Sequence, residues 1–279
     1  RAIGGAFARF VAGNGATAIV VGRDMRPDGE EFTAAFGEGA LDHGVDVVDV
    51  GLCATDMMYY ASGALGLPGA VFTASHNPAG YNGIKMCLSH AAPIGSDTGL
   101  SDIKEMAKAG PDPTGHKGTR VERDILDGYV AHVHSFVDID SLKPLKVVAD
   151  TANGMGGLVV PAVFDGLPFT LDHMFPELDG TFPNHPADPI QPENQRDLMA
   201  RVLETGADIG LAFDGDADRV FFVDETARPI SGSLATAMVA RSILEREPGA
   251  TVLHNLICSK TVAEVIAEGG GTAIRTKVG

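Results

Sequence analysis

Three aspartates alternate along one short acidic turn, at Asp214, Asp216 and Asp218, and Arg219 follows directly after them. In an extended chain, carboxylates two residues apart project to the same side, and a loop just past a strand can wrap them around one ion. Three adjacent carboxylates repel one another, so this arrangement is costly without a cation. Ligands that are all oxygen atoms favour a hard ion such as Mg²⁺ over zinc. The turn therefore predicts a magnesium site.

Other interpretations of this turn fit the residues less well. An EF-hand calcium loop needs glycine at its sixth position, where Arg219 stands, and flanking helices, where strands are predicted; Glu225 does fall at the twelfth position. A phosphatase of the haloacid-dehalogenase type expects threonine or valine in place of Asp218 and a further acidic pair downstream. Only one aspartate, Asp224, follows Asp218. A solvated acidic turn is the remaining alternative.

A second polar loop, residues 73–85, presents Ser75 in a Ser-His-Asn-Pro turn just past a predicted strand. A hydroxyl in that place can be presented at the edge of a sheet. The loop contains neither the G-x-S-x-G elbow of hydrolases nor the G-x-x-x-x-G-K-[ST] phosphate loop. By itself such a turn is more often a capping turn than a nucleophile, so it does not decide the function alone.

The elements that must position these two loops alternate between short apolar strands and helices. Strands are predicted at 18–21, 45–50, 70–73, 146–150, 209–213, 220–223, 251–256 and 272–276. Helices are predicted at 30–43, 56–67 with Asp56 as its cap, 102–108, 124–137, 193–205, 233–245 and 260–268. This alternation predicts an α/β architecture with mixed sheets. Three series of similar design suggest successive related α/β domains.

Composition limits the possible partners and compartments. The chain has 279 residues, enough for about two domains or two and a fragment, and 44% of them are apolar. Its formal net charge of −16 argues against nucleic acid or an anionic membrane as a partner. The three cysteines form no CxxC pair, which favours free thiols in a reducing compartment. No signal sequence or membrane-spanning run is evident, so a cytoplasmic protein is expected. The oligomeric state cannot be predicted.

Together, the two loops resemble the α-D-phosphohexomutase superfamily. Residues 73–78, Thr-Ala-Ser-His-Asn-Pro, and residues 214–219, Asp-Gly-Asp-Ala-Asp-Arg, carry the resemblance. The spacing, the strand contexts and the extension at residues 82–85 are similar to the bacterial phosphomannomutase/phosphoglucomutase branch. Residues 22–26 and 150–154 also resemble family segments. The likeness covers essentially the whole chain.

The resemblance implies a covalent carrier and a metal site. Ser75 would be a phosphoserine that passes its phosphoryl group to the sugar. Asp214, Asp216 and Asp218 would bind Mg²⁺, and an oxygen of the phosphoserine would complete the site. A phosphoserine adds a charge of about −1.5 to −2, which needs a metal and nearby cations before another anion can approach.

The resemblance also implies roles for the basic and polar residues around the carrier. His76, Lys85 and Arg219 match family positions around the phosphoryl group and are expected to be catalytic. Arg23 and Asn77 are expected to bind the substrate or its phosphate. The alternative for Lys85 is an ordinary surface lysine. The alternative for Arg23 is a residue that only ends a strand and has no role in binding.

On this resemblance, the chain is expected to be a phosphomannomutase. The enzyme would be an isomerase, an intramolecular phosphotransferase of carbohydrate metabolism that interconverts mannose 6-phosphate and mannose 1-phosphate and also the glucose phosphates. A hexose 1,6-bisphosphate would be both intermediate and primer. The alternatives are a phosphoglucosamine mutase of the same superfamily and a non-catalytic domain that binds sugar phosphate or Mg²⁺.

The resemblance also implies a division into domains. Residues 1–142 would form a first domain with the phosphoserine loop, residues 143–228 a second domain with the metal-binding loop, and residues 229–279 part of a third. We expect the sequence to be an excerpt of a longer chain. The excerpt would lack an amino-terminal segment, most of the third domain and the whole fourth domain of that chain.

Overall fold

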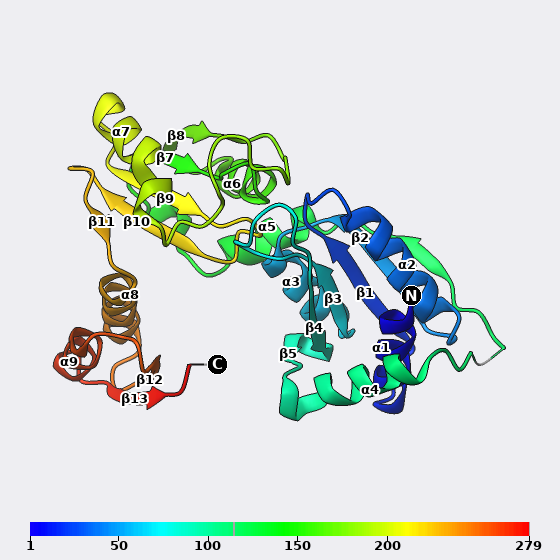
Figure 1. The fold of residues 1–279 in the computed structure, drawn as a ribbon. Helices are drawn as coiled ribbons and strands as arrows, with labels where there is room; N and C mark the ends of the chain where they lie inside the picture. Colours follow the sequence, from blue (N-terminus) through cyan, green and yellow to red (C-terminus); the bar gives the residue numbers. More distant parts are fainter. Residues whose placement is uncertain (114, 279) are drawn as a thin grey trace.

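The computed structural model describes residues 1–113 and 115–278, and Figure 1 shows the order of its elements. Thr114 and Gly279, which fall in the first and last predicted domains, lie outside the described residues. In this described part of the chain, three separate sheets follow one another, and helices pack against them. Within the described residues, no helix is both long enough and apolar enough to cross a membrane.

The first sheet presents the carboxyl ends of its parallel strands to the Ser75 loop. Its strand order is β5-β4-β3-β1-β2-β6, in which β3, β1, β2 and β6 pair in parallel while β4 pairs antiparallel with both β3 and β5. The bounds are β1 Ala18–Arg23, β2 Asp46–Leu52, β3 Gly69–Phe72, β4 Ile84–Leu88, β5 Ala92–Pro93 and β6 Arg120–Glu122. Because β2 and β3 lie on opposite sides of β1, the strand order reverses there, and ligands bind α/β sheets at such a reversal.

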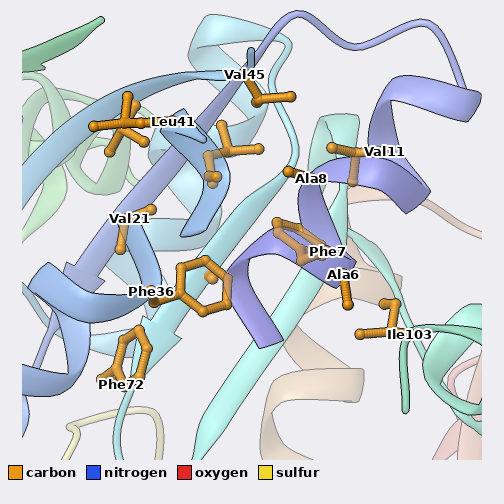
Figure 2. Close-up of a cluster of buried hydrophobic side chains, with 14 residues drawn as sticks. Ala6, Phe7, Ala8, Val11, Val21, Phe36, Leu41, Val45, Phe72 and Ile103 are labelled. Carbon is orange, nitrogen blue, oxygen red and sulfur yellow. The ribbon is translucent and has the colours of Figure 1, made fainter. Parts of the chain in front are cut away.

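One face of this sheet is covered by α1 (Ala2–Gly13), α2 (Gly29–Leu41) and α4 (Ser101–Ala109). The apolar side chains of α2 recur at helical spacing and bury against β1 and β3. Figure 2 shows the aromatic centre of this core, where the Phe36 ring lies 5.8 Å from that of Phe7 and 5.4 Å from that of Phe72.

The opposite face of the first sheet lies toward the second unit of the chain. It is covered by α3 (Thr55–Leu65) and α5 (Leu126–His134), and α6 (Gly156–Phe164) packs against α5. Met155 and Val159, at the start of α6, belong to the same apolar cluster as residues of α3 and β3. This cluster joins the first sheet to α6, whose Val160 packs in a separate cluster with strands of the second sheet.

The second sheet carries the acidic turn. Its order is β11-β10-β9-β7-β8, in which β8, β7 and β9 pair in parallel while β10 pairs antiparallel with both β9 and β11. The bounds are β7 Leu145–Asp150, β8 Phe169–Met174, β9 Ile209–Phe213, β10 Val220–Asp224 and β11 Pro229–Ile230, with α7 at Arg196–Thr205. Strands β9 and β10 form a hairpin whose connecting turn contains the three aspartates.

The last unit has a two-stranded parallel sheet. It consists of α8 (Gly232–Arg246), β12 (Thr251–Asn255), α9 (Lys260–Glu268) and β13 (Thr272–Thr276). Its small core, centred on Val262 and Ile266, is a cluster of its own. The short helical turns of the chain are Ser89–Ala91, Ser96–Leu100, Ile139–Ser141 and Pro192–Gln195.

The expected α/β class with mixed sheets is confirmed, while several short elements were not predicted and one cap was wrong. The unpredicted strands are β4, β5, β6, β8 and β11, and the unpredicted helix is α6, whose apolar run is interrupted by Pro161. Asp56 does not cap α3, because that helix begins at Thr55 with Ala54 as its N-cap. Asp56 lies instead in the first turn, where a carboxylate favours the helix dipole. The division into domains at residues 142 and 228 stays a prediction.

The aromatic core gives a first test of this fold. Phe36 is 2% exposed, so Phe36→Ala should lower the free energy of unfolding by about 3–5 kcal/mol through lost burial and a new cavity. Phe32→Ala on the same helix, where the side chain is 43% exposed, is the matched control and should cost much less. Urea titrations of the two variants should differ clearly; equal losses would mean that Phe36 is not a centre of the core.

Candidate active site

The acidic turn is folded tightly by its own hydrogen bonds. The amide of Asp214 donates to the Arg219 carbonyl at 3.2 Å, and the Arg219 amide donates to Asp214 Oδ1 at 3.1 Å. Ala217 has a left-handed φ of 57°, which reverses the chain between the strands. Asp214 and Asp216 are fully buried, and Asp218 is partly exposed. One oxygen from each of the three carboxylates lies within 4.8 Å of the others, so the turn forms one acidic triad.

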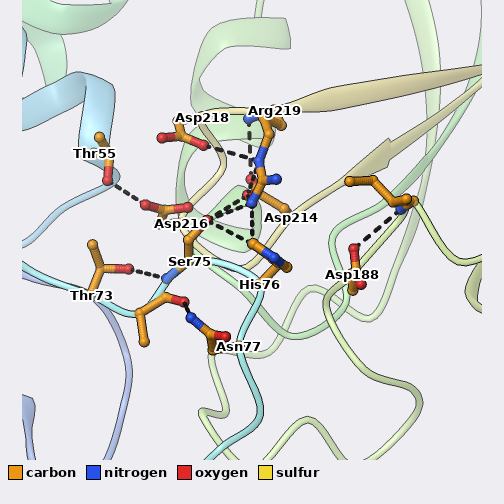
Figure 3. A network of polar contacts seen from close by, with 12 residues as sticks. Thr55, Thr73, Ser75, His76, Asn77, Asp188, Asp214, Asp216, Asp218 and Arg219 are labelled. Atoms are coloured by element: carbon orange, nitrogen blue, oxygen red, sulfur yellow. Dashed lines mark hydrogen bonds and ion pairs between the residues drawn. The ribbon is translucent and has the colours of Figure 1, made fainter. Parts of the chain in front are cut away.

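The structure brings Ser75 directly onto this triad, as Figure 3 shows. Ser75 follows β3 in a left-handed conformation with φ 53°, and its amide donates to Thr73 Oγ1 at 2.9 Å. Its hydroxyl donates to Asp214 Oδ2 at 2.9 Å, and Arg219 Nη2 donates to Ser75 Oγ at 2.7 Å. Two loops that are 139 residues apart in the sequence therefore meet at one hydroxyl.

Three predicted basic residues converge on the same place. Lys85 reaches the triad from β4, and its Nζ lies 2.6 Å from Asp216 Oδ2 and 2.7 Å from Asp218 Oδ2. His76 contacts the Arg219 guanidinium through Nδ1, which is also 3.5 Å from Ser75 Oγ. In this site, Lys85 pairs with two of the carboxylates and Arg219 pairs with the third.

The pKa values follow from this packing. Burial, together with the neighbouring charge of Asp216, raises the pKa of Asp214 to about 6 against the opposing effect of Arg219. Burial would also raise the pKa of Asp216, but the charge and hydrogen bond of Lys85 outweigh it and hold that pKa below its usual value. Burial lowers the pKa of Lys85, but the charges and hydrogen bonds of Asp216 and Asp218 together have the larger effect. The pKa of Lys85 is therefore raised, and the lysine stays charged.

The donor set fits a divalent cation. Asp216 Oδ1 is buried and has no hydrogen-bond partner among the described residues. A buried carboxylate oxygen without a partner costs free energy unless a ligand satisfies it. The three carboxylates supply only oxygen atoms, which hard cations prefer. The triad could therefore hold a metal ion.

The other two predicted site residues are not joined to the triad by the contacts that the structure describes. Arg23, at the end of β1, lies 3.5 Å from Glu30 and contacts the Asp24 carbonyl. Asn77 turns its side chain inward and donates to the Ala74 carbonyl at 2.9 Å. Asn77 thus braces the Ser75 loop, and the substrate-binding roles of both residues stay predictions.

Sequence reasoning missed Arg26, which supports the Ser75 loop from beneath. Its guanidinium donates to the carbonyls of Ser75 at 3.0 Å and Asn77 at 2.7 Å, and to two more at Pro78 and Tyr81. The side chain is fully buried and pairs with Asp24 at 3.3 Å. Residues 22–26 were recognised as a family segment, but nothing in the sequence shows that the second arginine, and not Arg23, points inward.

The acidic turn and the Ser75 loop touch through backbone. A Cβ on Gly215 would lie 2.4 Å from the Ser75 carbonyl oxygen, and one on Gly154 would lie 2.7 Å from the Gly215 carbonyl oxygen. Met155 donates its amide to that same Gly215 carbonyl at 2.9 Å. Only glycine allows the three segments to approach so closely.

This contact gives a second test. Gly215→Ala should push the Ser75 loop away from the triad, because the new methyl group meets backbone that cannot move aside cheaply. We expect the affinity for a divalent cation to fall by about tenfold, as changes just outside a metal's ligands do. Gly63→Ala on α3 is the control, since its Cβ would have nothing within 4 Å. Equal affinities of Gly215→Ala and the wild type in calorimetry would contradict this account.

Two family models match the chain. Residues 1–112 match phosphoglucomutase/phosphomannomutase, alpha/beta/alpha domain I, and residues 127–228 match domain II of the same family. The first match contains the Ser75 loop and the second contains the acidic turn.

Individual relatives agree with these models. Phosphomannomutase of Escherichia coli (strain K12) is 37% identical over 270 residues, which cover 94% of this chain and 59% of that protein. Phosphoglucomutase of Neisseria meningitidis serogroup B is 37% identical over 283 residues, which cover 99% and 60%. The crystal structure of a phosphoglucomutase/phosphomannomutase family protein from Burkholderia thailandensis superposes with a TM-score of 0.92 at 35% identity, covering 100% of this chain and 62% of that one. The chain thus spans about 60% of the length of these relatives and belongs to the phosphoglucomutase/phosphomannomutase family.

Proposed function

We propose that this chain carries the phosphoryl-transfer site of a phosphomannomutase, which interconverts mannose 6-phosphate and mannose 1-phosphate and also acts on the glucose phosphates. The observation that carries the proposal is the position of Ser75 Oγ, 2.9 Å from Asp214 Oδ2 and 2.7 Å from Arg219 Nη2. A hydroxyl held between a carboxylate and a guanidinium can carry a phosphoryl group beside the charges that stabilise it. The names of the relatives support the substrate class.

In the proposed reaction, phosphorylated Ser75 gives its phosphoryl group to a free hydroxyl of the hexose phosphate. The P–O bond to Ser75 breaks, a P–O bond to the sugar forms, and the proton of the sugar hydroxyl passes overall to Ser75 Oγ. The product is a hexose 1,6-bisphosphate. After the sugar reverses its orientation, Ser75 takes back the group from the other end. The same bisphosphate would phosphorylate an unmodified Ser75 and so act as primer.

The basic residues would stabilise charge during this transfer. Arg219 already donates to Ser75 Oγ, so its guanidinium would lie beside the transferring oxygens. Lys85 stays charged between its carboxylates, and His76 adjoins the serine. Cations fixed around a transferring phosphoryl group lower the barrier because they need no reorganisation as charge develops. Arg23 and Asn77 would bind the phosphate of the substrate.

Mg²⁺ is the cation that we propose for the acidic triad of Asp214, Asp216 and Asp218, with Ser75 as a further ligand. When bound, this ion would neutralise phosphoryl oxygens and polarise the bond to phosphorus. The buried, unpartnered Asp216 Oδ1 supports this assignment. We also propose a cytoplasmic protein, which is supported by the buried free thiols of Cys53 and Cys87. The formal net charge of −16 supports the further proposal that neither nucleic acid nor a membrane is a partner.

The carrier can be tested by labelling. Incubation with mannose 1,6-bisphosphate labelled in its phosphates should place the label on Ser75, since the hydroxyl already lies among the cations. Ser75→Ala should take no label, while Ser242→Ala, which changes an exposed serine on α8, should be labelled like the wild type. Phosphopeptide mapping reads the result. Label confined to an aspartate would overturn the assignment and favour a phosphatase-like carboxylate carrier.

The metal site can be tested separately by calorimetry with Mg²⁺. Asp216→Asn should weaken binding by at least about tenfold, because it removes one of the ligand charges. Circular dichroism should show a folded variant, because Lys85 still pairs with Asp218 at 2.7 Å after Asp216 loses its charge. Asp97→Asn, at an exposed carboxylate in the first unit, is the control. Unchanged Mg²⁺ affinity in Asp216→Asn would place the metal elsewhere.

A further inference from the structure

Residues 179–188, between β8 and the short turn Pro192–Gln195, have no regular secondary structure yet are closely held. Asp179 starts the segment by accepting the amide of Thr181 at 2.9 Å, and the Phe182 amide donates to the Asp179 carbonyl at 3.0 Å. Phe182 adopts a left-handed φ of 53°. A strained residue held by several bonds indicates a segment whose shape is specified.

On one side, this segment reaches the support of the Ser75 loop. The Phe182 ring, 9% exposed, lies 5.2 Å from Arg26 Cζ in a cation–π contact. The backbone follows closely, because a Cβ on Gly180 would lie 2.7 Å from Arg26 Cα. Since Arg26 donates to the carbonyls of Ser75 and Asn77, the ring fixes the guanidinium that holds the loop.

On the other side, the same segment reaches the support of the acidic turn. His185 Nε2 lies 2.9 Å from Asp150 Oδ2, and the other oxygen of that buried carboxylate accepts the Ala152 amide at 2.9 Å. Asn184 donates to Asn153 Oδ1 at 2.7 Å. These contacts hold residues 150–155, whose last amide donates to the Gly215 carbonyl inside the turn.

The His185 ring is built to hold Asp150 firmly. Its Nδ1 lies 2.9 Å from the Pro186 carbonyl while Nε2 faces the carboxylate, so both nitrogens face acceptors. Both can donate only in the protonated ring. Burial lowers the pKa of His185, but the bond to Asp150 outweighs it and the pKa is raised.

We propose that residues 179–188 form a clasp that sets the position of Ser75 relative to the acidic triad, with Phe182 as a positioning residue for the Ser75 loop and His185 as one for the metal-binding turn. The inference rests on the proposed function for its chemical consequence. Among the contacts described for residues 1–113 and 115–278, none joins Phe182 or His185 to the hydroxyl or the triad, so each acts through one buried charged partner, Arg26 or Asp150. Phosphoryl transfer is sensitive to such placement, because a misplacement of about 1 Å can cost on the order of 100-fold in rate.

Because the two contacts act on different loops, the two variants should have different effects. At saturating Mg²⁺, Phe182→Leu should slow labelling of Ser75 by mannose 1,6-bisphosphate by about tenfold or more, while Mg²⁺ affinity stays within about twofold of wild type. His185→Leu should instead weaken Mg²⁺ binding by about tenfold. Phe182→Tyr keeps the aromatic ring and should retain part of the labelling rate that Phe182→Leu loses. His185→Gln keeps one hydrogen-bond donor and should retain part of the Mg²⁺ affinity that His185→Leu loses.

Controls separate positioning from general destabilisation. Ile190→Ala, at a 53% exposed side chain in the same connection, should change neither readout. Circular dichroism and urea unfolding identify folded variants, and the conservative pair provides the comparison if a leucine variant does not fold. Folded variants that lose both readouts equally, or neither, would overturn the clasp.

Amide hydrogen exchange tests the clasp without any chemistry. Phe182→Leu should speed exchange at residues 74–77, and His185→Leu should speed it at residues 214–218. If the wild-type chain takes no label from the bisphosphate, the proposed function fails, but this exchange pattern still decides on the clasp. Uniform exchange changes in both loops would contradict it.

Discussion

The mutual repulsion of three aspartates held in a small volume determines which residues must surround them. Three carboxylates bring oxygens within 4.8 Å of one another, and two of these residues are fully buried, where water cannot screen them. The balancing cations come from separate parts of the fold, Lys85 from β4 of the first sheet and Arg219 from the end of the acidic turn, directly before β10 of the second. Lys85 can offset the charge of the triad only while the first and second units are packed together, which makes the packing between them part of the chemistry.

Backbone strain accompanies this arrangement at both loops. Ser75 and Ala217 are left-handed without being glycines, a conformation that costs on the order of 1–3 kcal/mol for each residue. The bonds from Arg26 to four carbonyls, and the exchange of hydrogen bonds between Asp214 and Arg219, offset that cost. In this conformation Ser75 directs its hydroxyl to Asp214 in the neighbouring turn.

The sequence predicted most of the strands and helices and the meeting of the two loops, but few of the supports. The uninterrupted apolar run at residues 18–21 predicts β1 locally, and the motif around Ser75 could be matched to a family. Arg26, Phe182 and His185 could not be singled out, because their importance depends on partners far away in the chain. Pro161 obscured α6, since proline usually argues against a helix interior. The left-handed Ser75 likewise follows from tertiary contacts and not from serine's own preference.

The core shared by α3, α5 and α6 bears on how this protein can be divided. The two family models end and begin between residues 112 and 127, which suggests that the chain could be cut there into modules. Met155 and Val159 nevertheless pack among the apolar side chains of α3, as part of one cluster. A fragment ending before α6 would expose that apolar surface to water and tend to aggregate. The boundary between the two family models therefore does not separate two independent hydrophobic cores. A recombinant gene joined at that boundary would have to encode matching apolar residues on both sides of it.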